Sequence, residues 1–247
     1  GSPFFATGTG SPIEQTDYAY VPGNLNAANR IESITRKNLS GSGVPNQTRK
    51  TAFAYLYAYG PSKLPSQITV DGPLPGTSDS TVYKYDSIGN LTSISNSYGH
   101  QTVYGNFTGL GKPRTISHPN GASESLIYDT SGRLISRYVR IDGSNRGTTY
   151  RYNGFDEVTQ IQKTNTGETQ NFAYDAFGRL IYSDNGVGDS AWYAYTKLSK
   201  VLRMTQSHNG SLVLSKDFGY DEAGNLRSVR GNNGQLDTYE YDAADRV

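Results

Sequence analysis

A chain of 247 residues is long enough to bury a sizeable core, but only 34% of its residues are hydrophobic, and it carries 20 tyrosines and 28 glycines. We therefore expect a folded, β-rich protein that buries tyrosine rings in place of aliphatic side chains. A net charge of +1 and the absence of cysteine argue against a nucleic-acid partner and exclude disulfides and thiolate metal sites.

The first 17 residues precede the repetitive part of the chain. Gly1-Ser2 has the form of a scar left by an expression tag. Residues 4–12 are compatible with a strand on the edge of the following array or with a lead lacking regular structure, and both remain open. The domain prediction is a lead over 1–17 and a repeat array over 18–247. The sequence contains no run of about 18 apolar residues, so we expect no membrane span.

From residue 18 onward a unit of about 22 residues recurs, and a fixed period decides the fold class before any other signal. The clearest copies, at 83–91, 172–180 and 218–226, read aromatic-x-Tyr-Asp-x-x-Gly-Arg/Asn-Leu. We call the second aromatic residue of each copy the marker. It falls at Tyr59, Tyr85, Phe107, Tyr128, Tyr152, Tyr174, Tyr195, Tyr220 and Tyr241. A further copy begins at 18–20 and resumes at 29–31, which gives about ten units, the last one truncated.

Each unit predicts two strands and two turns. The marker and the aromatic residue two positions before it share one face of a strand. Asp-x-x-Gly then predicts a tight turn with Gly at positive φ, and an apolar residue two positions later opens the return strand. Asn-Gly or Asp-Gly pairs at 120–121, 142–143, 185–186, 209–210 and 233–234 predict the opposite turns. The prediction is an all-β fold of antiparallel β-hairpin repeats in a long meander sheet, which must curl because it exceeds about ten strands.

The residues that define the best-matching repeats receive a structural role as repeat signature. They are Tyr85, Asp86, Gly89, Leu91, Tyr128, Asp129, Gly132, Leu134, Tyr174, Asp175, Gly178, Leu180, Tyr220, Asp221, Gly224, Leu226, Tyr241 and Asp242. Other repeats depart from the pattern, with Lys63, Asp156, Ser199 and Asp245 at the Gly position and Gly60, Thr108, Asn153 and Thr196 at the Asp position. We expect looser turns in those repeats.

This pattern at this spacing resembles the RHS/YD repeats of bacterial polymorphic toxins, Tc toxin subunits and teneurins, over about residues 18–247. The resemblance implies a ribbon of antiparallel sheet that spirals into a hollow shell. In toxin relatives the shell encloses a C-terminal effector, and in teneurins it supports cell-surface adhesion. The expected partners are thus the remainder of the shell and the enclosed domain, and the expected location is secreted or cell surface. The family's shells are longer, so we expect a piece of an array.

The repeated tyrosines and aspartates could have a binding or catalytic role instead of a structural one. The rings form either the packing ladder of the sheet or an exposed platform for carbohydrate, and their fixed phase favours packing. The repeated aspartates could serve as paired acids of a glycosidase, but each begins a predicted turn, where Asp accepts backbone N–H bonds. The functional hypotheses are therefore a shell wall, a glycan-binding or adhesion module, and a carbohydrate-active enzyme, with the wall preferred.

Two further features could indicate a metal or catalytic site. The stretch 184–189 contains three acidic or amide residues but lacks the ligand spacing of an EF-hand, so a hairpin tip is preferred. The only histidines, His100, His118 and His208, lie beside turn residues and are expected in surface loops. We predict no catalytic residue, no cofactor and no metal site, and hence no enzyme.

Overall fold

The computed structural model describes residues 13–22, 29–40, 43–44, 46–58, 64–242 and 246. All regular secondary structure in these residues is β-strand. The chain divides into two compact parts, residues 1–123 and 124–247. We call them the N-terminal sheet and the C-terminal sheet.

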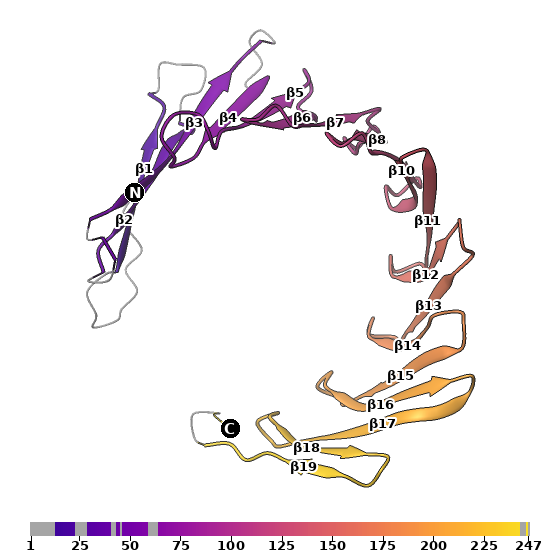
Figure 1. Cartoon of the computed structure of the whole chain (residues 1–247). Helices are drawn as coiled ribbons and strands as arrows, with labels where there is room; N and C mark the ends of the chain where they lie inside the picture. Colours follow the sequence, from indigo (N-terminus) through magenta and orange to yellow (C-terminus); the bar gives the residue numbers. More distant parts are fainter. Residues whose placement is uncertain are drawn as a thin grey trace. The chain divides into compact units, whose positions relative to one another are not determined.

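The N-terminal sheet is a meander in which each strand pairs antiparallel with the next one in the chain (Figure 1). Its strands are β1 (Glu14–Tyr20), β2 (Ile31–Asn38), β3 (Thr48–Leu56), β4 (Gln67–Asp71), β5 (Thr81–Tyr85), β6 (Leu91–Asn96), β7 (Gln101–Gly105) and β8 (Thr115–Ser117). β1 begins at Glu14, four residues before the predicted start of the array. The alternatives for residues 4–12 lie outside the described residues.

The C-terminal sheet continues the same construction. Its strands are β9 (Ser123–Tyr128), β10 (Leu134–Ile141), β11 (Ser144–Tyr152), β12 (Val158–Lys163), β13 (Thr169–Tyr174), β14 (Leu180–Asp184), β15 (Asp189–Tyr195), β16 (Val201–His208), β17 (Ser211–Tyr220), β18 (Leu226–Gly231) and β19 (Leu236–Thr238). β9 pairs with β10, and every later pair is antiparallel between chain neighbours. The predicted all-β fold of antiparallel hairpins is confirmed.

A β-bulge accompanies the marker tyrosine in most repeats. The register shifts between Lys84 and Tyr85, and again immediately before the later markers Tyr152, Tyr174, Tyr195 and Tyr220. The bulge places the marker directly opposite the apolar residue that opens the return strand, as in the pair Tyr85 and Leu91. The bulges recur with the period of the sequence because each one lies at a marker. A bulge increases the local twist of the strands.

The opposite turns use the predicted Asn-Gly and Asp-Gly pairs. Asp142 and Gly143 both have positive φ, at 50° and 79°, as do Asn209 and Gly210, at 49° and 77°. Two consecutive positive φ angles define a type I′ turn, whose twist matches that of the flanking strands. Turns of one kind thus lie along one edge of each sheet, and turns of the other kind lie along the opposite edge.

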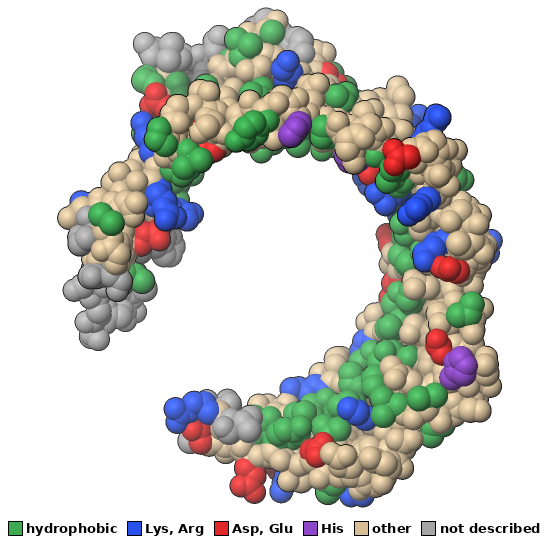
Figure 2. Space-filling model, in the orientation of Figure 1, with side chains coloured by type: hydrophobic (Ala, Val, Ile, Leu, Met, Phe, Trp, Pro, Cys, Tyr) green, Lys and Arg blue, Asp and Glu red, His purple; other side chains and the backbone are tan. Residues whose placement is uncertain are grey.

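The length of the chain would allow a sizeable core, but the described residues form none, and the tyrosine rings are less buried than expected. Among the described residues only Ala122 and Leu126 are buried hydrophobics, and no large side chain is fully buried. The marker tyrosines from Tyr85 onward are half-buried instead. The reason is that each part is one sheet layer, in which a side chain packs only against neighbours on its own face. Figure 2 shows hydrophobic side chains gathered over β14–β18 without a second layer above them.

No helix in the described portion of the chain is long and apolar enough to cross a membrane.

Candidate functional site

The Asp-x-x-Gly turns share one hydrogen-bond pattern. The Oδ1 atom of Asp175 accepts the backbone N–H groups of Phe177 at 2.9 Å and Arg179 at 3.0 Å. The backbone N–H of Gly178 donates to the carbonyl of Asp175 at 3.1 Å, and Gly178 has φ 77°. Asp86 and Asp129 accept the equivalent pairs of N–H groups. The aspartate therefore accepts hydrogen bonds from backbone N–H groups of the turn that lack a partner on a neighbouring strand.

The other signature glycines and aspartates occupy the same positions. Gly89, Gly132 and Gly224 have φ between 79° and 93°, and Gly111 of a less regular repeat has φ 73°. Asp221 and Asp242 each accept the N–H four residues later, at 2.7 Å and 3.0 Å. Glycine adopts these angles without steric cost, whereas a side chain at positive φ is strained.

The expectation of looser turns is wrong for the turns at 108, 153 and 196. Asn153 Oδ1 and Thr196 Oγ1 accept the same two N–H groups that the aspartates accept, and so does Thr108 Oγ1. At the glycine position, Asp156 and Ser199 adopt φ 65° and 60°. Amide and hydroxyl oxygens can replace a carboxylate as acceptor, so the turn is conserved in geometry despite its changed sequence. Gly60, Lys63 and Asp245 lie outside the described residues.

From Tyr152 onward, the marker hydroxyl joins a repeat to the preceding one. Tyr195 Oη donates to the carbonyl of Leu180 at 2.7 Å, and Tyr220 Oη donates to the carbonyl of Val201 at 2.8 Å. The same bond runs from Tyr152 to Leu134, from Tyr174 to Val158 and from Tyr241 to Leu226, at 2.8 to 3.0 Å. Tyrosine hydroxyls are protonated at neutral pH and can donate, and partial burial raises the pKa of Tyr174, Tyr195 and Tyr220 further.

In the N-terminal sheet the corresponding bond is made by Tyr55, which donates to the carbonyl of Ile31 at 2.8 Å. The repeat alignment instead assigned the marker to Tyr59, which lies outside the described residues. Tyr55 lies four residues before Tyr59, and the connection from β3 to β4 is longer than those of the later hairpins. Local sequence shows only the period, whereas the hydroxyl's partner depends on which strands become neighbours.

Sequence reasoning missed the role of one cation in the repeat. It lies between the turn glycine and the apolar residue of the return strand, as Arg179 lies between Gly178 and Leu180. Arg179 Nε donates to Asp175 Oδ2 at 2.7 Å, while its Nη1 donates to the carbonyl of Thr196 in the next turn at 3.0 Å. The guanidinium lies 4.7 Å from the ring centroid of Tyr195. It therefore contacts its own turn, the next turn and the next marker at once.

The same contact recurs along the chain. Arg133 donates to Asp129 and to Asp156 of the next turn, each at 2.7 Å, and lies 4.9 Å from the Tyr152 ring. Lys200 lies 5.4 Å from the Tyr220 ring, and Arg30 lies 5.7 Å from that of Tyr55. We call these cations, together with the marker hydroxyl bonds, the inter-repeat ladder. The motif shows this cation at its Arg/Asn position. The next turn and the next marker ring, which the cation contacts, lie one repeat further along the chain.

Removal of one ladder hydroxyl is expected to have a modest effect on stability. Tyr195→Phe keeps the ring beneath Arg179 but removes the bond to the Leu180 carbonyl, so the free energy of unfolding should fall by about 1 kcal/mol. Urea denaturation followed by fluorescence of the single tryptophan, Trp192, measures it. Tyr193→Phe is the matched control on the same strand. An equal loss in both variants would show that the ladder bond contributes nothing special.

The turn aspartates predict a pH dependence of stability. The N–H of Arg133 lowers the pKa of Asp129, and the side chain of Arg179 lowers the pKa of Asp175. Their folded pKa values thus lie below the unfolded value of about 3.9. The stabilisation is present above that value and is lost as pH falls through the folded values. The urea midpoint should therefore drop below about pH 4, and Asp175→Asn should reduce that drop. A midpoint independent of pH in this range contradicts the assignment.

The acidic and imidazole groups do not converge on a reaction centre in the described residues. Asp129 and Asp175 are each engaged in their own turn and ion pair. Among described residues no group of three His, Asp or Glu side chains could hold a metal ion. The stretch 184–189 forms the turn between β14 and β15, and Asp189 accepts from Asn185 at 2.7 Å.

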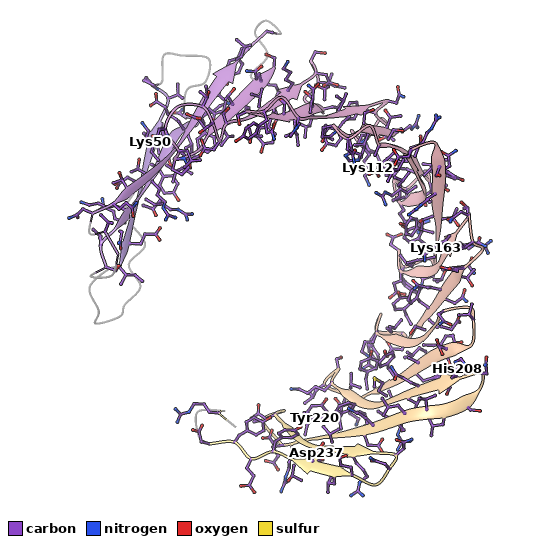
Figure 3. All side chains as sticks on the ribbon, viewed as in Figure 1. Lys50, Lys112, Lys163, His208, Tyr220 and Asp237 are labelled. Carbon is purple, nitrogen blue, oxygen red and sulfur yellow. The ribbon has the colours of Figure 1, made fainter. Side chains whose placement is uncertain are left out.

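The histidines lie at sheet edges. His208 is the last residue of β16 rather than a loop residue, and Figure 3 shows it where that strand turns back, at the edge opposite Tyr220. Its Nδ1 lies 2.6 Å from Asp189 Oδ1, and both side chains are exposed. His100 follows the turn at 96–99, and His118 begins the turn that contains Gly121.

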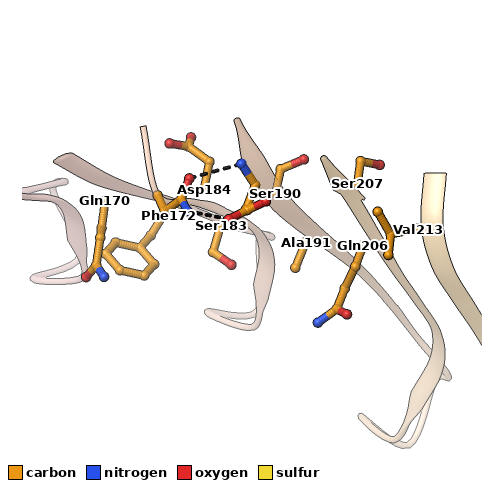
Figure 4. A pocket seen from close by; sticks show the side chains of 11 residues that line it. Gln170, Phe172, Ser183, Asp184, Ser190, Ala191, Gln206, Ser207 and Val213 are labelled. Atoms are coloured by element: carbon orange, nitrogen blue, oxygen red, sulfur yellow. Dashed lines mark hydrogen bonds between the residues drawn. The ribbon is translucent and has the colours of Figure 1, made fainter. Parts of the chain in front are cut away.

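A shallow hollow of about 450 Å³ lies on the C-terminal sheet. One row across β13–β16 lines it, with Phe172 opposite Ser183, Ser183 opposite Ala191 and Ala191 opposite Gln206. Figure 4 shows Phe172, Ser183 and Gln206 on one side of the ribbon. The small central residues leave space between the Phe172 ring and the Gln206 amide, and the carboxylates of Asp184 and Asp189 also line the hollow.

Comparison with known proteins places this geometry in a family. Residues 115–247, more than half of the chain, match the family model described as Teneurin YD-shell. Double-stranded DNA deaminase toxin A of Burkholderia cenocepacia (strain H111) is 26% identical over 206 residues, which cover 71% of this chain and 14% of the toxin. Teneurin-1 of Gallus gallus is 27% identical over 162 residues, covering 62% of this chain and 6% of the teneurin.

Further similarities agree. The probable deoxyribonuclease RhsB of Dickeya dadantii (strain 3937) is 28% identical over 141 residues, covering 52% of this chain and 10% of RhsB. The chain thus spans 6% to 14% of these relatives. The crystal structure of TcdB2-TccC3 without its hypervariable C-terminal region superposes with a TM-score of 0.54 at 16% identity, over 87% of this chain and 13% of that one, which shows a shared fold. The chain therefore belongs to the teneurin YD-shell family, as a structural segment of an RHS/YD-repeat shell.

Proposed function

We propose that this segment forms part of the wall of a shell that encloses or presents a C-terminal effector of the same polypeptide. The observation that carries the proposal is the inter-repeat ladder, which bonds the repeats from Tyr152 onward to the ones before them through tyrosine, cation and turn contacts. Without a core of its own, a repeat of this kind is stabilised mainly by its neighbours. Such a construction makes a continuous wall. In this proposal any catalytic activity belongs to another part of the polypeptide.

The names of the relatives support an effector rather than adhesion alone. One relative is named a DNA deaminase toxin and another a probable deoxyribonuclease, and this chain spans at most 14% of either. We infer that the chain itself is not the enzyme, and that its partners are the remaining shell and the enclosed domain. Export to the outside of the cell follows as part of the same proposal. The signature tyrosines, aspartates and glycines are then wall residues.

Limited proteolysis of the full-length polypeptide tests the enclosure. We expect the domain after the repeats to resist protease in the wild type and to become accessible when Arg133, Arg179 and Lys200 are all replaced by alanine. The matched control replaces the exposed Arg140, Arg146 and Lys197. If the domain after the repeats is digested equally fast in all three proteins, it is not enclosed by a wall that the ladder holds together.

Carbohydrate binding is the second candidate, because the hollow at Phe172 offers a ring for stacking and the amides of Gln170 and Gln206 for hydroxyl groups. Titration with a panel of neutral trisaccharides, followed by NMR chemical shifts, tests it. Saturable shifts that Phe172→Ala abolishes and Phe177→Ala preserves support this candidate. Absence of saturable shifts at millimolar sugar removes it and leaves the wall proposal untouched.

A further inference from the structure

Three side chains at neighbouring hairpin tips of the C-terminal sheet form a hydrogen-bonded chain that contributes to no ladder bond. His208 Nδ1 lies 2.6 Å from Asp189 Oδ1, and Asn209 Nδ2 lies 3.0 Å from His208 Nε2. All three side chains are exposed. Gly210 follows Asn209, and a glycine leaves its backbone nitrogen open to react with the preceding side chain. The tip therefore combines a reactive dipeptide with an imidazole.

Asp189 orients this imidazole. The hydrogen bond with His208 lowers the pKa of Asp189, so its carboxylate is ionised at neutral pH and accepts the Nδ1–H. In this tautomer of the neutral imidazole, Nε2 carries a lone pair and lies beside the Asn209 amide. A carboxylate that fixes a histidine in this way prepares it to take up a proton and to return it.

The Asn209 amide is held in place from two sides. Its backbone N–H donates to the carbonyl of Gly188 at 2.8 Å. Its Oδ1 atom lies so close to Gly188 that a Cβ added to that glycine would overlap it. The oxygen of the amide therefore faces the tip of the β14–β15 hairpin, while the nitrogen faces His208. In a displacement at Asn209 Cγ, the leaving nitrogen is thus the atom beside the imidazole.

The other Asn-Gly pairs of the chain lack this arrangement. They begin at Asn120, Asn153, Asn185 and Asn233. In each of them the asparagine Oδ1 accepts the backbone N–H two residues later, at 2.9 to 3.1 Å, which holds the side chain in an Asx turn. In the described part of the chain Asn209 makes no such bond, and it alone of these asparagines bonds to a histidine. His208 thus sets Asn209 apart from the other four.

From these contacts we propose that His208 promotes the deamidation of Asn209, which converts this asparagine to aspartate or isoaspartate. The backbone nitrogen of Gly210 attacks Asn209 Cγ, and its proton passes to His208 Nε2 directly or through one water. The bond from Cγ to Nδ2 then breaks, and Nδ2 leaves as ammonia with the proton that Nε2 returns. Water opens the resulting cyclic imide at either of its two carbonyl groups. The reaction needs no oxidant, and it does not depend on whether the chain forms a shell wall.

Incubation of the whole chain at neutral pH and physiological temperature, followed by digestion and mass spectrometry of the peptides, tests the proposal. Asn233 is the internal standard, because it also precedes glycine at an exposed tip but bonds to the Gln235 N–H. We expect Asn209 to deamidate at least fivefold faster than Asn233. In alkaline buffer the two rates should converge, because hydroxide then removes the glycine N–H proton at both sites. Equal rates at neutral pH overturn the proposal.

His208→Gln separates the effect of the imidazole from that of the turn. Glutamine keeps a polar side chain but does not exchange protons at neutral pH, so Asn209 should slow to the rate of Asn233, whose own rate stays unchanged. Asp189→Asn removes the carboxylate that orients the imidazole, and it should slow Asn209 at neutral pH but not in alkaline buffer. A rate at Asn209 that survives His208→Gln overturns the proposal. If circular dichroism shows that this variant does not fold, the comparison of Asn209 with Asn233 in the wild type decides alone.

Discussion

Gly178→Val is expected to lower the free energy of unfolding by about 2–3 kcal/mol. Gly178 has φ 77°, in the left-handed region that a β-branched side chain strongly disfavours. The added Cβ would also lie 2.9 Å from the Glu157 carboxylate, which must then move. The turn cannot change shape easily, because Asp175 accepts hydrogen bonds from its N–H groups and Arg179 binds the Thr196 carbonyl of the next turn. Urea denaturation followed by Trp192 fluorescence and circular dichroism measures the loss.

Gly154→Val is the matched control for this substitution. Gly154 belongs to a turn of the same kind, but its φ is outside the left-handed region and an added Cβ would meet no atom within 4 Å. Its effect should stay within about 0.5 kcal/mol. The reverse change, Ser199→Gly, should stabilise the chain slightly because it relieves a positive φ of 60°. Equal destabilisation by valine at 154 and 178 would contradict the importance of the left-handed angle.

Arg179→Ala is expected to cost about 2 kcal/mol, more than an ordinary surface ion pair. The substitution removes the bond to Asp175, the bond to the Thr196 carbonyl and the contact with the Tyr195 ring. Only 22% of the Arg179 side chain is exposed, so water replaces these partners poorly. The measurement is again the urea midpoint. Hydrogen exchange should also show faster opening of β15, because the lost contacts reach into the next repeat.

Arg203→Ala provides the comparison for Arg179. Arg203 on β16 pairs with Asp217, which lies opposite it on the neighbouring strand β17, but both side chains are largely exposed. Its removal should change the urea midpoint little, because exposed pairs are screened by water. If Arg203→Ala and Arg179→Ala shift the midpoint alike, the ladder is no more than a set of surface ion pairs.

These variants together describe how a sheet with so little buried surface can persist. Ala122 and Leu126 alone cannot provide a core, so stability is distributed along the repeats. Each marker ring is covered on one side by its neighbours, and in several repeats a cation lies over it. An interruption at one repeat is therefore expected to affect the adjacent repeats most, as nearest-neighbour coupling in repeat proteins predicts.

The sequence by itself determined the class of structure, because turn chemistry and strand alternation are local. Asp175 and Gly178 lie three residues apart, so their spacing alone predicts the turn they form. The Asp142-Gly143 and Asn209-Gly210 turns followed from the same kind of rule, since positive φ at two successive residues needs this composition. The period of about 22 residues then extended each local prediction along the chain.

Only the tertiary structure decided how the repeats are joined and how little they bury. The partner of the Tyr195 hydroxyl is the carbonyl of Leu180, 15 residues away, and the partner of Arg179 is the following turn. A periodic sequence does not say which repeat a side chain contacts. Nor does it say that Asn153 and Thr196 preserve a turn designed for aspartate, since that depends on where their oxygen atoms lie. The half-burial of the tyrosines has the same origin, because composition counts aromatic rings but only the single-layer sheet determines how many sides of each ring are covered.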